Sequence, residues 1–140
     1  MPILAIPVAS SLLALSGLHI FWGFAGKWGA LAVVPSKADG TILFQPGLVP
    51  CLGVAFGLGA TAWLALIAEN ILPNPLAALL LIKLRWGVAG LFTIRCIGDF
   101  HYVGLFRKIR TTDFGARDRK FYTPLCLFYA TAFAMLALYY

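Results

Sequence analysis

The residues with the clearest chemical potential are four ionisable side chains in or beside one long apolar stretch: Lys83, Arg85, Arg95 and Asp99. A charge near the middle of a membrane helix costs about 2.5 to 3.5 kcal/mol on insertion scales, so such residues usually face a protein interior and have partners. Arg95 and Asp99 are four residues apart and share a helical face, which predicts an ion pair between them. The residues alone leave open whether this pair serves packing or a functional site.

Arg85 lies near the Asp99 face of the predicted helix and opposite Lys83, with no carboxylate within one helical turn. Its counter-charge must therefore come from another helix, a lipid or a ligand. A contact between subunits would also provide one, and for this reason we expect a homo-oligomer. Lys83 lies about 10 Å from the nearer membrane boundary, which its long side chain can reach.

His19 and Trp22 are three residues apart in the first apolar stretch and share a helical face. A histidine hydrogen-bonded to a neighbouring helix is the simpler interpretation of His19. If the first and third stretches are in contact, however, His19, Trp22, Arg95, Asp99 and His101 line one polar chamber that opens to the cytoplasm. Such a chamber would perturb the protonation of His19 and Asp99, as acid and base sites require.

These side chains belong to a chain with the composition of a membrane protein. Of its 140 residues 61% are hydrophobic and only 11% are charged, far from the balance of soluble domains. A helix needs about 20 apolar residues to cross the hydrocarbon layer, where open strands are excluded. Four stretches approach that length, at residues 3–26, 48–68, 76–98 and 121–140. We predict an all-α fold, a single transmembrane domain over residues 1–140 that forms an integral membrane four-helix bundle.

Basic residues outside these stretches predict the orientation, because positive loops stay in the cytoplasm. Lys27 and Lys37 lie between the first and second stretches. Between the third and fourth lie Arg107, Lys108, Arg110, Arg117, Arg119 and Lys120. The N-terminus, the turn at residues 69–75 and the C-terminus contain no Lys or Arg. Both termini are therefore expected outside, in a multi-pass membrane protein.

The loop at residues 101–120 has a second interpretation. Its cations alternate with aromatic and apolar residues, as is typical of segments that lie in the membrane interface. Anionic lipid headgroups would attract each cation by about 1 kcal/mol. A solvated loop is the simpler alternative. The net charge of +6 is concentrated in this loop rather than spread over a wet surface, so we predict no nucleic-acid partner.

Glycines and cysteines complete the set of informative residues. Close helix contacts are predicted at Gly53, Gly57, Gly59, Gly87 and Gly90. The cysteines are Cys51, Cys96 and Cys126, which form no CxxC motif and are expected to be free thiols. Together with His19 and His101 they lie at a similar depth, which raises the possibility of zinc or copper binding. Cysteine is also an ordinary small residue of packed helices, so we predict no metal.

Two segments of the sequence carry a recognisable pattern of residues. The first carries His19, Trp22, Gly23, Gly26, Trp28, Gly29 and Pro35. The second is the run at residues 95–104, followed by Thr112, Asp113, Phe114, Ala116, Asp118 and the run at residues 122–127. The two segments resemble a family of small bacterial membrane proteins catalogued as domain of unknown function 3995. The resemblance covers nearly the whole chain and implies a four-helix protein of the bacterial inner membrane, without an agreed activity.

Two classes of function are compatible with these residues. In the first, a polar cluster in the cytoplasmic half of the bundle binds a small anionic or lipid-like ligand. Its predicted binding residues are Arg85, Arg95, His19, Trp22, Trp86, Asp99 and His101. In the second, a small membrane enzyme performs acid–base chemistry of the isomerase or cyclase type on a hydrophobic substrate, with Asp99 or His19 as acid or base. A purely structural role is the remaining alternative, and the sequence identifies no cofactor.

Overall fold

The computed structural model of the chain describes residues 3–24, 34, 37–39, 41, 47–98, 104, 106, 108 and 113–139. Four long helices are present: α1 (Ala5–Gly23), α3 (Leu48–Ala68), α4 (Ala78–Ile97) and α6 (Thr123–Tyr139). A short helix, α5 (Asp113–Arg117), and a π-helical segment, η1 (Asp118–Tyr122), lead directly into α6. The described residues contain helices and no strand, which confirms the all-α prediction.

Three helical stretches are long and apolar enough to cross a membrane: α1, α3 and the continuous stretch Gly115–Tyr139. Helix α4 is comparable in length, at 20 residues, but it carries Lys83, Arg85 and Arg95. The predicted second stretch has the same bounds as α3, whereas α1 and α4 are slightly shorter than their predicted stretches.

The final helical stretch begins earlier than the predicted residue 121. Thr123 and Pro124 resemble a helix start, but the chain is already helical from Asp113. A proline inside a helix lacks an N–H group, and its ring clashes with the carbonyl group four residues earlier. The turn before Pro124 is widened into η1, in which the Thr123 N–H donates to the Asp118 carbonyl oxygen five residues earlier. The wider turn accommodates the proline without ending the helix.

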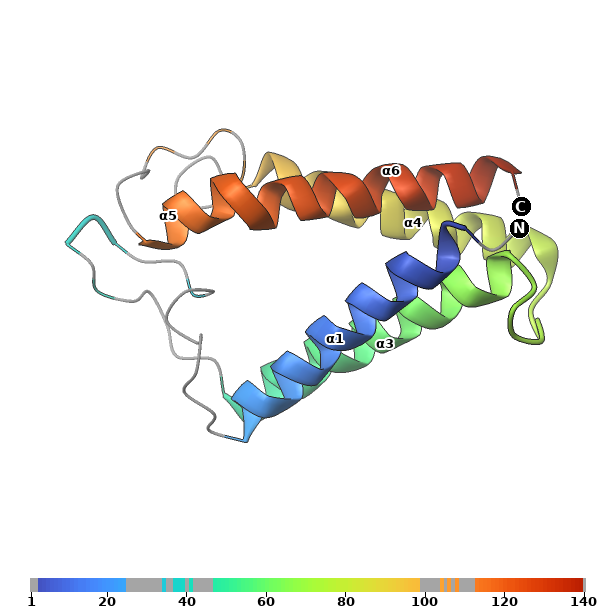
Figure 1. The fold of residues 1–140 in the computed structure, drawn as a ribbon, viewed down its shortest axis with the longest axis horizontal. Helices are drawn as coiled ribbons and strands as arrows, with labels where there is room; N and C mark the ends of the chain where they lie inside the picture. The colour runs from blue at the N-terminus through green and yellow to red at the C-terminus, as the bar shows by residue number, and fades with distance from the viewer. Residues whose placement is uncertain are drawn as a thin grey trace.

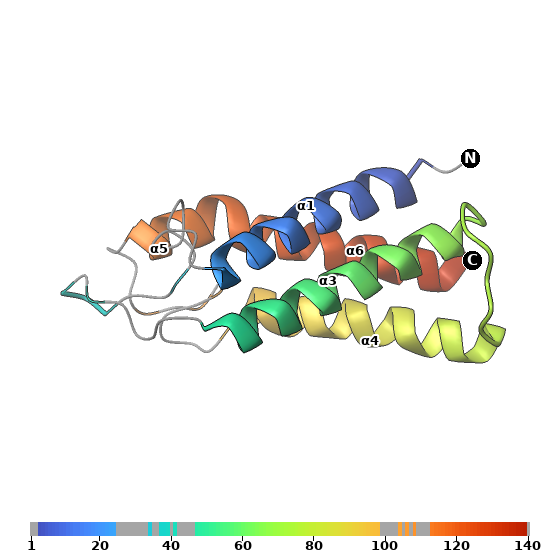
Figure 2. The same ribbon diagram turned by 90° about the horizontal axis from the view of Figure 1, so that it is seen from below.

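The long helices form two antiparallel pairs. Helix α1 packs along α3, and α4 packs along α6, with few contacts between the pairs. The pairs meet at the end of the molecule that carries both termini and diverge toward the opposite end (Figure 1). Figure 2 shows the same two pairs after a quarter turn, again with the termini at one end. The bundle is therefore closed at one end and open at the other.

The hydrophobic core lies at the closed end. It combines the first half of α1, the second half of α3 and the facing parts of α4 and α6. Its largest fully buried apolar side chains are Leu12, Ile67, Tyr129, Phe133 and Leu136. Between them lie many alanines, which allow helices to approach closely.

Polar contacts reinforce this end of the molecule. The Tyr129 hydroxyl of α6 donates to the Ser11 Oγ of α1 across 2.9 Å, and Ser11 in turn donates to the Val8 carbonyl oxygen. Glu69, directly after α3, accepts the Ala5 N–H at 3.3 Å. The first N–H groups of a helix have no partner within it, so this carboxylate caps the start of α1.

The predicted glycine contacts are wrong for four of the five positions. A Cβ atom built at Gly53, Gly57, Gly87 or Gly90 would meet nothing within 4 Å, because these positions face outward. Alanines make the close contacts in the core instead. Among the described glycines of the long helices, the tightest position is Gly23, where a Cβ atom would lie 3.1 Å from the Cys51 Cβ.

Removing the Tyr129 hydroxyl tests how strongly the two pairs are joined. Tyr129→Phe loses one buried hydrogen bond while Ser11 keeps its own acceptor, so we expect a loss of about 1 kcal/mol in the free energy of unfolding. Reversible unfolding in mixed detergent micelles measures this loss. The control is Tyr139→Phe, at a residue that is 75% exposed, which should change stability little. Equal losses in Tyr129→Phe and Tyr139→Phe would contradict a stabilising hydrogen bond between Tyr129 and Ser11.

Candidate functional site

A cavity of about 420 Å³ lies between the two helix pairs, on the open side of the core. Its volume is within the range of small-molecule sites. Both pairs contribute to its wall, together with Val34 from the first loop. The lining residues are Leu15, His19, Trp22, Val34, Pro50, Cys51, Val54, Leu58, Phe92, Arg95, Tyr122, Leu125, Cys126 and Tyr129.

The cavity wall changes in character along the helices. Its deep end, next to the core, is formed by Leu15, Leu58, Phe92 and Tyr129. Its outer end is formed by Trp22, Pro50, Arg95 and Tyr122. Trp22 is seven positions after Leu15 in the same helix, which corresponds to a depth of about 10 Å. The cavity therefore has an apolar floor and, toward the long loops, an outer end that carries the polar groups of Arg95 and Tyr122; we call this end the mouth.

His19 and Trp22 form a unit on the α1 wall. Their rings make an edge-to-face contact with centroids 5.1 Å apart. The His19 Nδ1 atom lies 2.8 Å from the Leu15 carbonyl oxygen. A carbonyl oxygen only accepts, so the neutral imidazole carries its proton on Nδ1 and keeps Nε2 as a proton acceptor.

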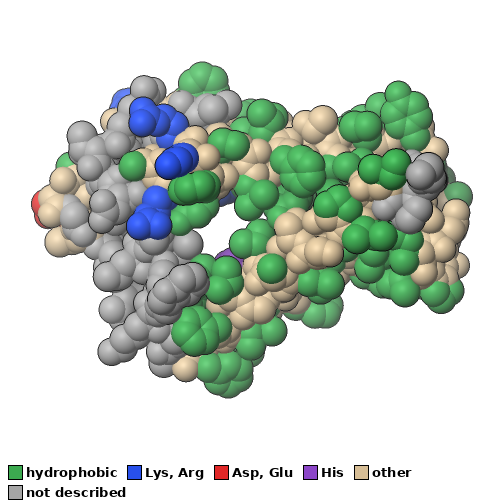
Figure 3. All heavy atoms as spheres, viewed as in Figure 1, with side chains coloured by type: hydrophobic (Ala, Val, Ile, Leu, Met, Phe, Trp, Pro, Cys, Tyr) green, Lys and Arg blue, Asp and Glu red, His purple; other side chains and the backbone are tan. Residues whose placement is uncertain are grey.

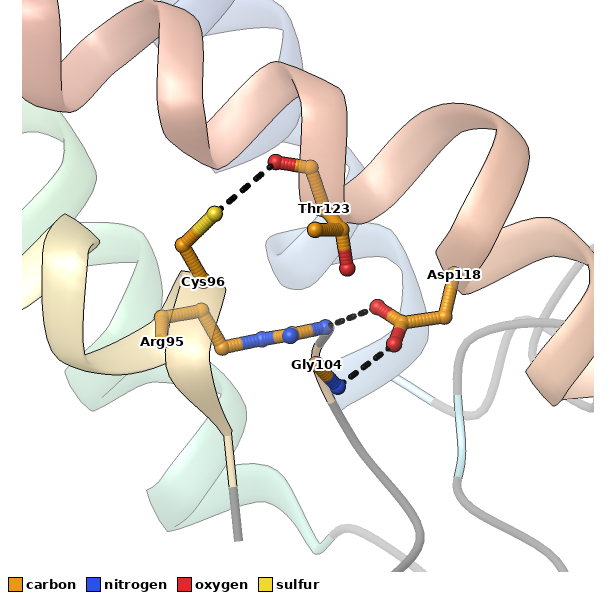
Figure 4. Close-up of polar contacts among 5 residues, drawn as sticks. All are labelled: Arg95, Cys96, Gly104, Asp118 and Thr123. Carbon is orange, nitrogen blue, oxygen red and sulfur yellow. Dashed lines mark hydrogen bonds and ion pairs between the residues drawn. The ribbon is translucent and has the colours of Figure 1, made fainter. Parts of the chain in front are cut away.

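Arg95 is held at the mouth of the cavity by a buried carboxylate. Its Nη2 atom lies 2.8 Å from the Asp118 Oδ1 atom, and the Asp118 side chain is completely buried. The second carboxylate oxygen, Oδ2, accepts the Gly104 N–H at 2.7 Å. Figure 4 shows the carboxylate between these two donors, with Cys96 and Thr123 beside them. Asp118 thus joins the end of α4, the following loop and the start of η1.

Gly104 has a backbone conformation that this arrangement requires. Its φ angle is +89°, a region that residues with a side chain rarely adopt. A Cβ atom at this position would lie 2.6 Å from the Gly98 Cα atom, where there is no space for it.

The predicted pair between Arg95 and Asp99 stays a prediction. The expected partner, Asp99, lies outside the described residues, as does His101. The structure pairs Arg95 with Asp118, which is 23 residues away. Sequence reasoning did not single out Asp118 as a site residue. A signal was present, because it is the only acidic residue in the basic run at residues 117–120.

Arg85 is buried between α4 and α6 rather than in the cavity. Its side chain is 1% exposed, and its Nη1 atom donates to the Leu136 carbonyl oxygen at 3.4 Å. Leu136 is in the last turn of α6, where carbonyl groups lack helical partners and carry partial negative charge. The counter-charge is therefore the end of a neighbouring helix, one of the predicted sources. Because the side chain is buried, it gives no argument for a subunit contact.

The structure brings together three of the seven predicted ligand-binding residues. His19, Trp22 and Arg95 line the cavity. Trp86 does not line it, and its side chain is 46% exposed. Arg85 is enclosed by helices, and Asp99 and His101 lie outside the described residues.

All three cysteines are free thiols, as expected. Cys51 and Cys126 line the cavity, whereas the Cys96 Sγ atom lies 3.6 Å from the Thr123 carbonyl oxygen. Within the described part of the chain, no three His, Cys, Asp or Glu residues are grouped closely enough to hold a metal ion.

Three candidate membrane-spanning helices around an apolar cavity define the class: an integral, multi-pass membrane protein. The chain belongs to the family described as "Protein of unknown function (DUF3995)", which it matches over residues 12–133. The resemblance noted in the sequence is thereby confirmed. Neither the curated proteins nor the solved structures give a match.

A double-mutant cycle tests the Arg95–Asp118 pair. Asp118→Asn leaves the guanidinium without its charged partner, and we expect a loss of about 3 kcal/mol in unfolding free energy. Arg95→Met combined with Asp118→Asn should lose less than the sum of the single changes, by at least about 1 kcal/mol. Asp39→Asn, at an exposed loop position, is the control. Additive losses in the double variant would show that the pair contributes no coupling.

Proposed function

We propose that this protein crosses the bacterial inner membrane four times and binds an amphipathic, lipid-like molecule in the cavity between its helix pairs. The observation that carries the proposal is the gradient along the cavity wall, from the apolar floor at Leu15 and Leu58 to the polar mouth at Trp22 and Arg95. A molecule with an apolar body and one polar head matches this gradient.

The proposal treats α4 as the fourth span despite its three cations. Arg85 is buried against the end of α6, and Arg95 is paired with Asp118. Lys83 is exposed near the start of the helix, from which its side chain can extend toward the headgroups. An even number of spans also agrees with the position of both termini at one end (Figure 1).

The proposed orientation places the termini outside. The exposed cations Lys108, Arg117, Arg119 and Lys120 belong to the opposite, loop-bearing end of the molecule. Positive residues are retained on the cytoplasmic side, so this end is the one that faces the cytoplasm.

Labelling of single cysteines tests this topology. In a variant whose three native cysteines are replaced by alanine, Asn74→Cys should react with a membrane-impermeant maleimide in intact cells. Arg119→Cys should react only after the cells are opened, because both side chains are exposed but lie on opposite sides. The reverse pattern would invert the proposed orientation, and labelling of both would contradict the four-span arrangement.

The charge balance of the cavity favours a lipid-like ligand over a small multivalent anion. The positive charge of Arg95 is paired with the carboxylate of Asp118. Arg85 lies outside the cavity and donates to the Leu136 carbonyl oxygen. Arg95 keeps one donor, because its Nη1 atom has no hydrogen-bond partner among the described residues. This nitrogen is itself buried, so it offers no exposed charge to a ligand in the cavity.

Access to the cavity also favours a ligand that comes from the membrane. Figure 3 shows an opening through the molecule between the two helix pairs, bordered by hydrophobic side chains. An opening in the plane of the helices would face lipid in the proposed orientation. A membrane-dissolved ligand would reach the cavity without passing through water.

A larger side chain in the apolar floor of the cavity tests whether a ligand binds there. Leu58→Trp places a larger ring where the apolar body would lie, and we expect the amount of co-purifying lipid-like species to fall by at least about tenfold, a loss of 1.4 kcal/mol or more. Native mass spectrometry of gently extracted protein measures the bound species. Leu52→Trp makes the same change on the same helix but outside the cavity, and should retain them. Equal retention by both variants would refute the site.

Acid–base catalysis on the bound molecule is the second candidate function. It is favoured by His19, whose Nδ1 contact with Leu15 leaves Nε2 as the acceptor on a cavity-lining ring. Asp99, the other predicted acid or base, lies outside the described residues. Recovered ligand distinguishes the two functions. A binding protein yields the same compound from wild type and His19→Gln, whereas an enzyme yields product from the first and substrate from the second.

A further inference from the structure

A second surface of chemical interest lies away from the cavity, at the loop-bearing end of the molecule. It combines four exposed cations with two exposed aromatic rings, and Figure 3 shows Lys and Arg side chains gathered at this end beside hydrophobic ones. We call it the basic-aromatic surface. Its described members are Phe106, Lys108, Arg117, Arg119, Lys120 and Phe121.

The basic-aromatic surface is assembled by the buried carboxylate of Asp118. Phe106 and Lys108 follow Gly104, whose N–H donates to Asp118 Oδ2. Arg117 and Arg119 flank Asp118 directly, and Lys120 follows Arg119. The same carboxylate is buried and paired with Arg95, so it does not neutralise the exposed cations. The hydrogen bond from Gly104 therefore anchors the segment that leads to Lys108 beside the turn that carries Arg117, Arg119 and Lys120.

The depth of this surface follows from the length of the last helical stretch. Gly115–Tyr139 contains 25 residues, or about 37 Å of helix, whereas the hydrocarbon layer is about 30 Å thick. About 20 residues counted back from Tyr139 cross the hydrocarbon and end near Lys120. The turn that carries Arg117, Arg119 and Lys120 then lies in the headgroup layer.

The side chains suit that layer. Phe106 and Phe121 are 58% and 53% exposed, and the Lys120 Nζ atom lies 5.2 Å from the centre of the Phe121 ring. Rings of this kind enter the edge of the hydrocarbon, while ammonium and guanidinium groups contact phosphates above it. Arginine adds paired donors that match phosphate oxygens.

We propose that the basic-aromatic surface is a binding site for anionic phospholipid headgroups. The inference rests on the proposed membrane crossing of α6, but it does not depend on the cavity or its ligand. The site would select lipids by headgroup charge, whereas the cavity would select by the shape of an apolar body.

Lipid titration of the full-length protein in a neutral detergent tests this site. We expect phosphatidylglycerol to bind more tightly than phosphatidylcholine with the same acyl chains, as counted by native mass spectrometry. Arg119→Gln with Lys120→Gln should weaken phosphatidylglycerol binding by about thirty-fold, from about fivefold for each cation. The matched comparison uses single variants: Arg119→Gln should weaken binding about fivefold, whereas Lys83→Gln, which removes an exposed cation from the other half of the molecule, should change binding less than about twofold.

Three outcomes would each overturn the proposal that the basic-aromatic surface binds anionic phospholipid headgroups. Equal binding of the two lipids would show that headgroup charge is not the basis of recognition. An equal loss of binding in Arg119→Gln and Lys83→Gln would show that binding follows the net charge of the protein and not this surface. Displacement of the lipid by inorganic phosphate at similar concentration would identify a soluble anion as the occupant. Leu58→Trp should leave phosphatidylglycerol binding intact, so failure of the cavity and failure of this surface are distinguishable. The cysteine labelling tests the membrane crossing on its own.

Discussion

The completely buried carboxylate of Asp118 is the contact on which the open end of the molecule depends. It holds the Arg95 guanidinium at the cavity mouth and the Gly104 N–H in the following loop. Asp118 is also the first residue of the π-helical segment, and the last residue of that segment, Tyr122, lines the cavity. A buried carboxylate is stable only with such donors around it, so the loop, the mouth of the cavity and the start of the last helix are held in place together.

The opposite end is stabilised by different means. Alanine-rich faces let the four helices approach, and Tyr129 contacts Ser11 across the two pairs. Because the core is confined to this end, the pairs separate beyond it and leave a cavity rather than a filled bundle. The same geometry gives the cavity its apolar floor, since the floor is the outer layer of the core.

Helix α4 illustrates how a charged helix can belong to an apolar assembly. Arg85 reaches the last turn of α6, where unpaired carbonyl groups carry partial negative charge, and Arg95 reaches a carboxylate. Each cation thus has at least one hydrogen-bond acceptor within this helix pair. This arrangement leaves the wall that faces the other pair largely apolar, which is consistent with a site for a lipid-like molecule rather than a small anion.

The sequence by itself determined the helical class, the bounds of α3, the approximate positions of the other long helices, the clustering of cations and the family. These features follow from composition and hydropathy along a continuous stretch, which are local properties. Only the tertiary structure decided that Arg95 pairs with Asp118, that Arg85 is buried against α6 and that Trp86 lies outside the cavity. Those outcomes depend on which helices are neighbours and on their relative rotation. Periodicity places a residue on a face of its helix, but the neighbour of that face is set by the packing of distant segments.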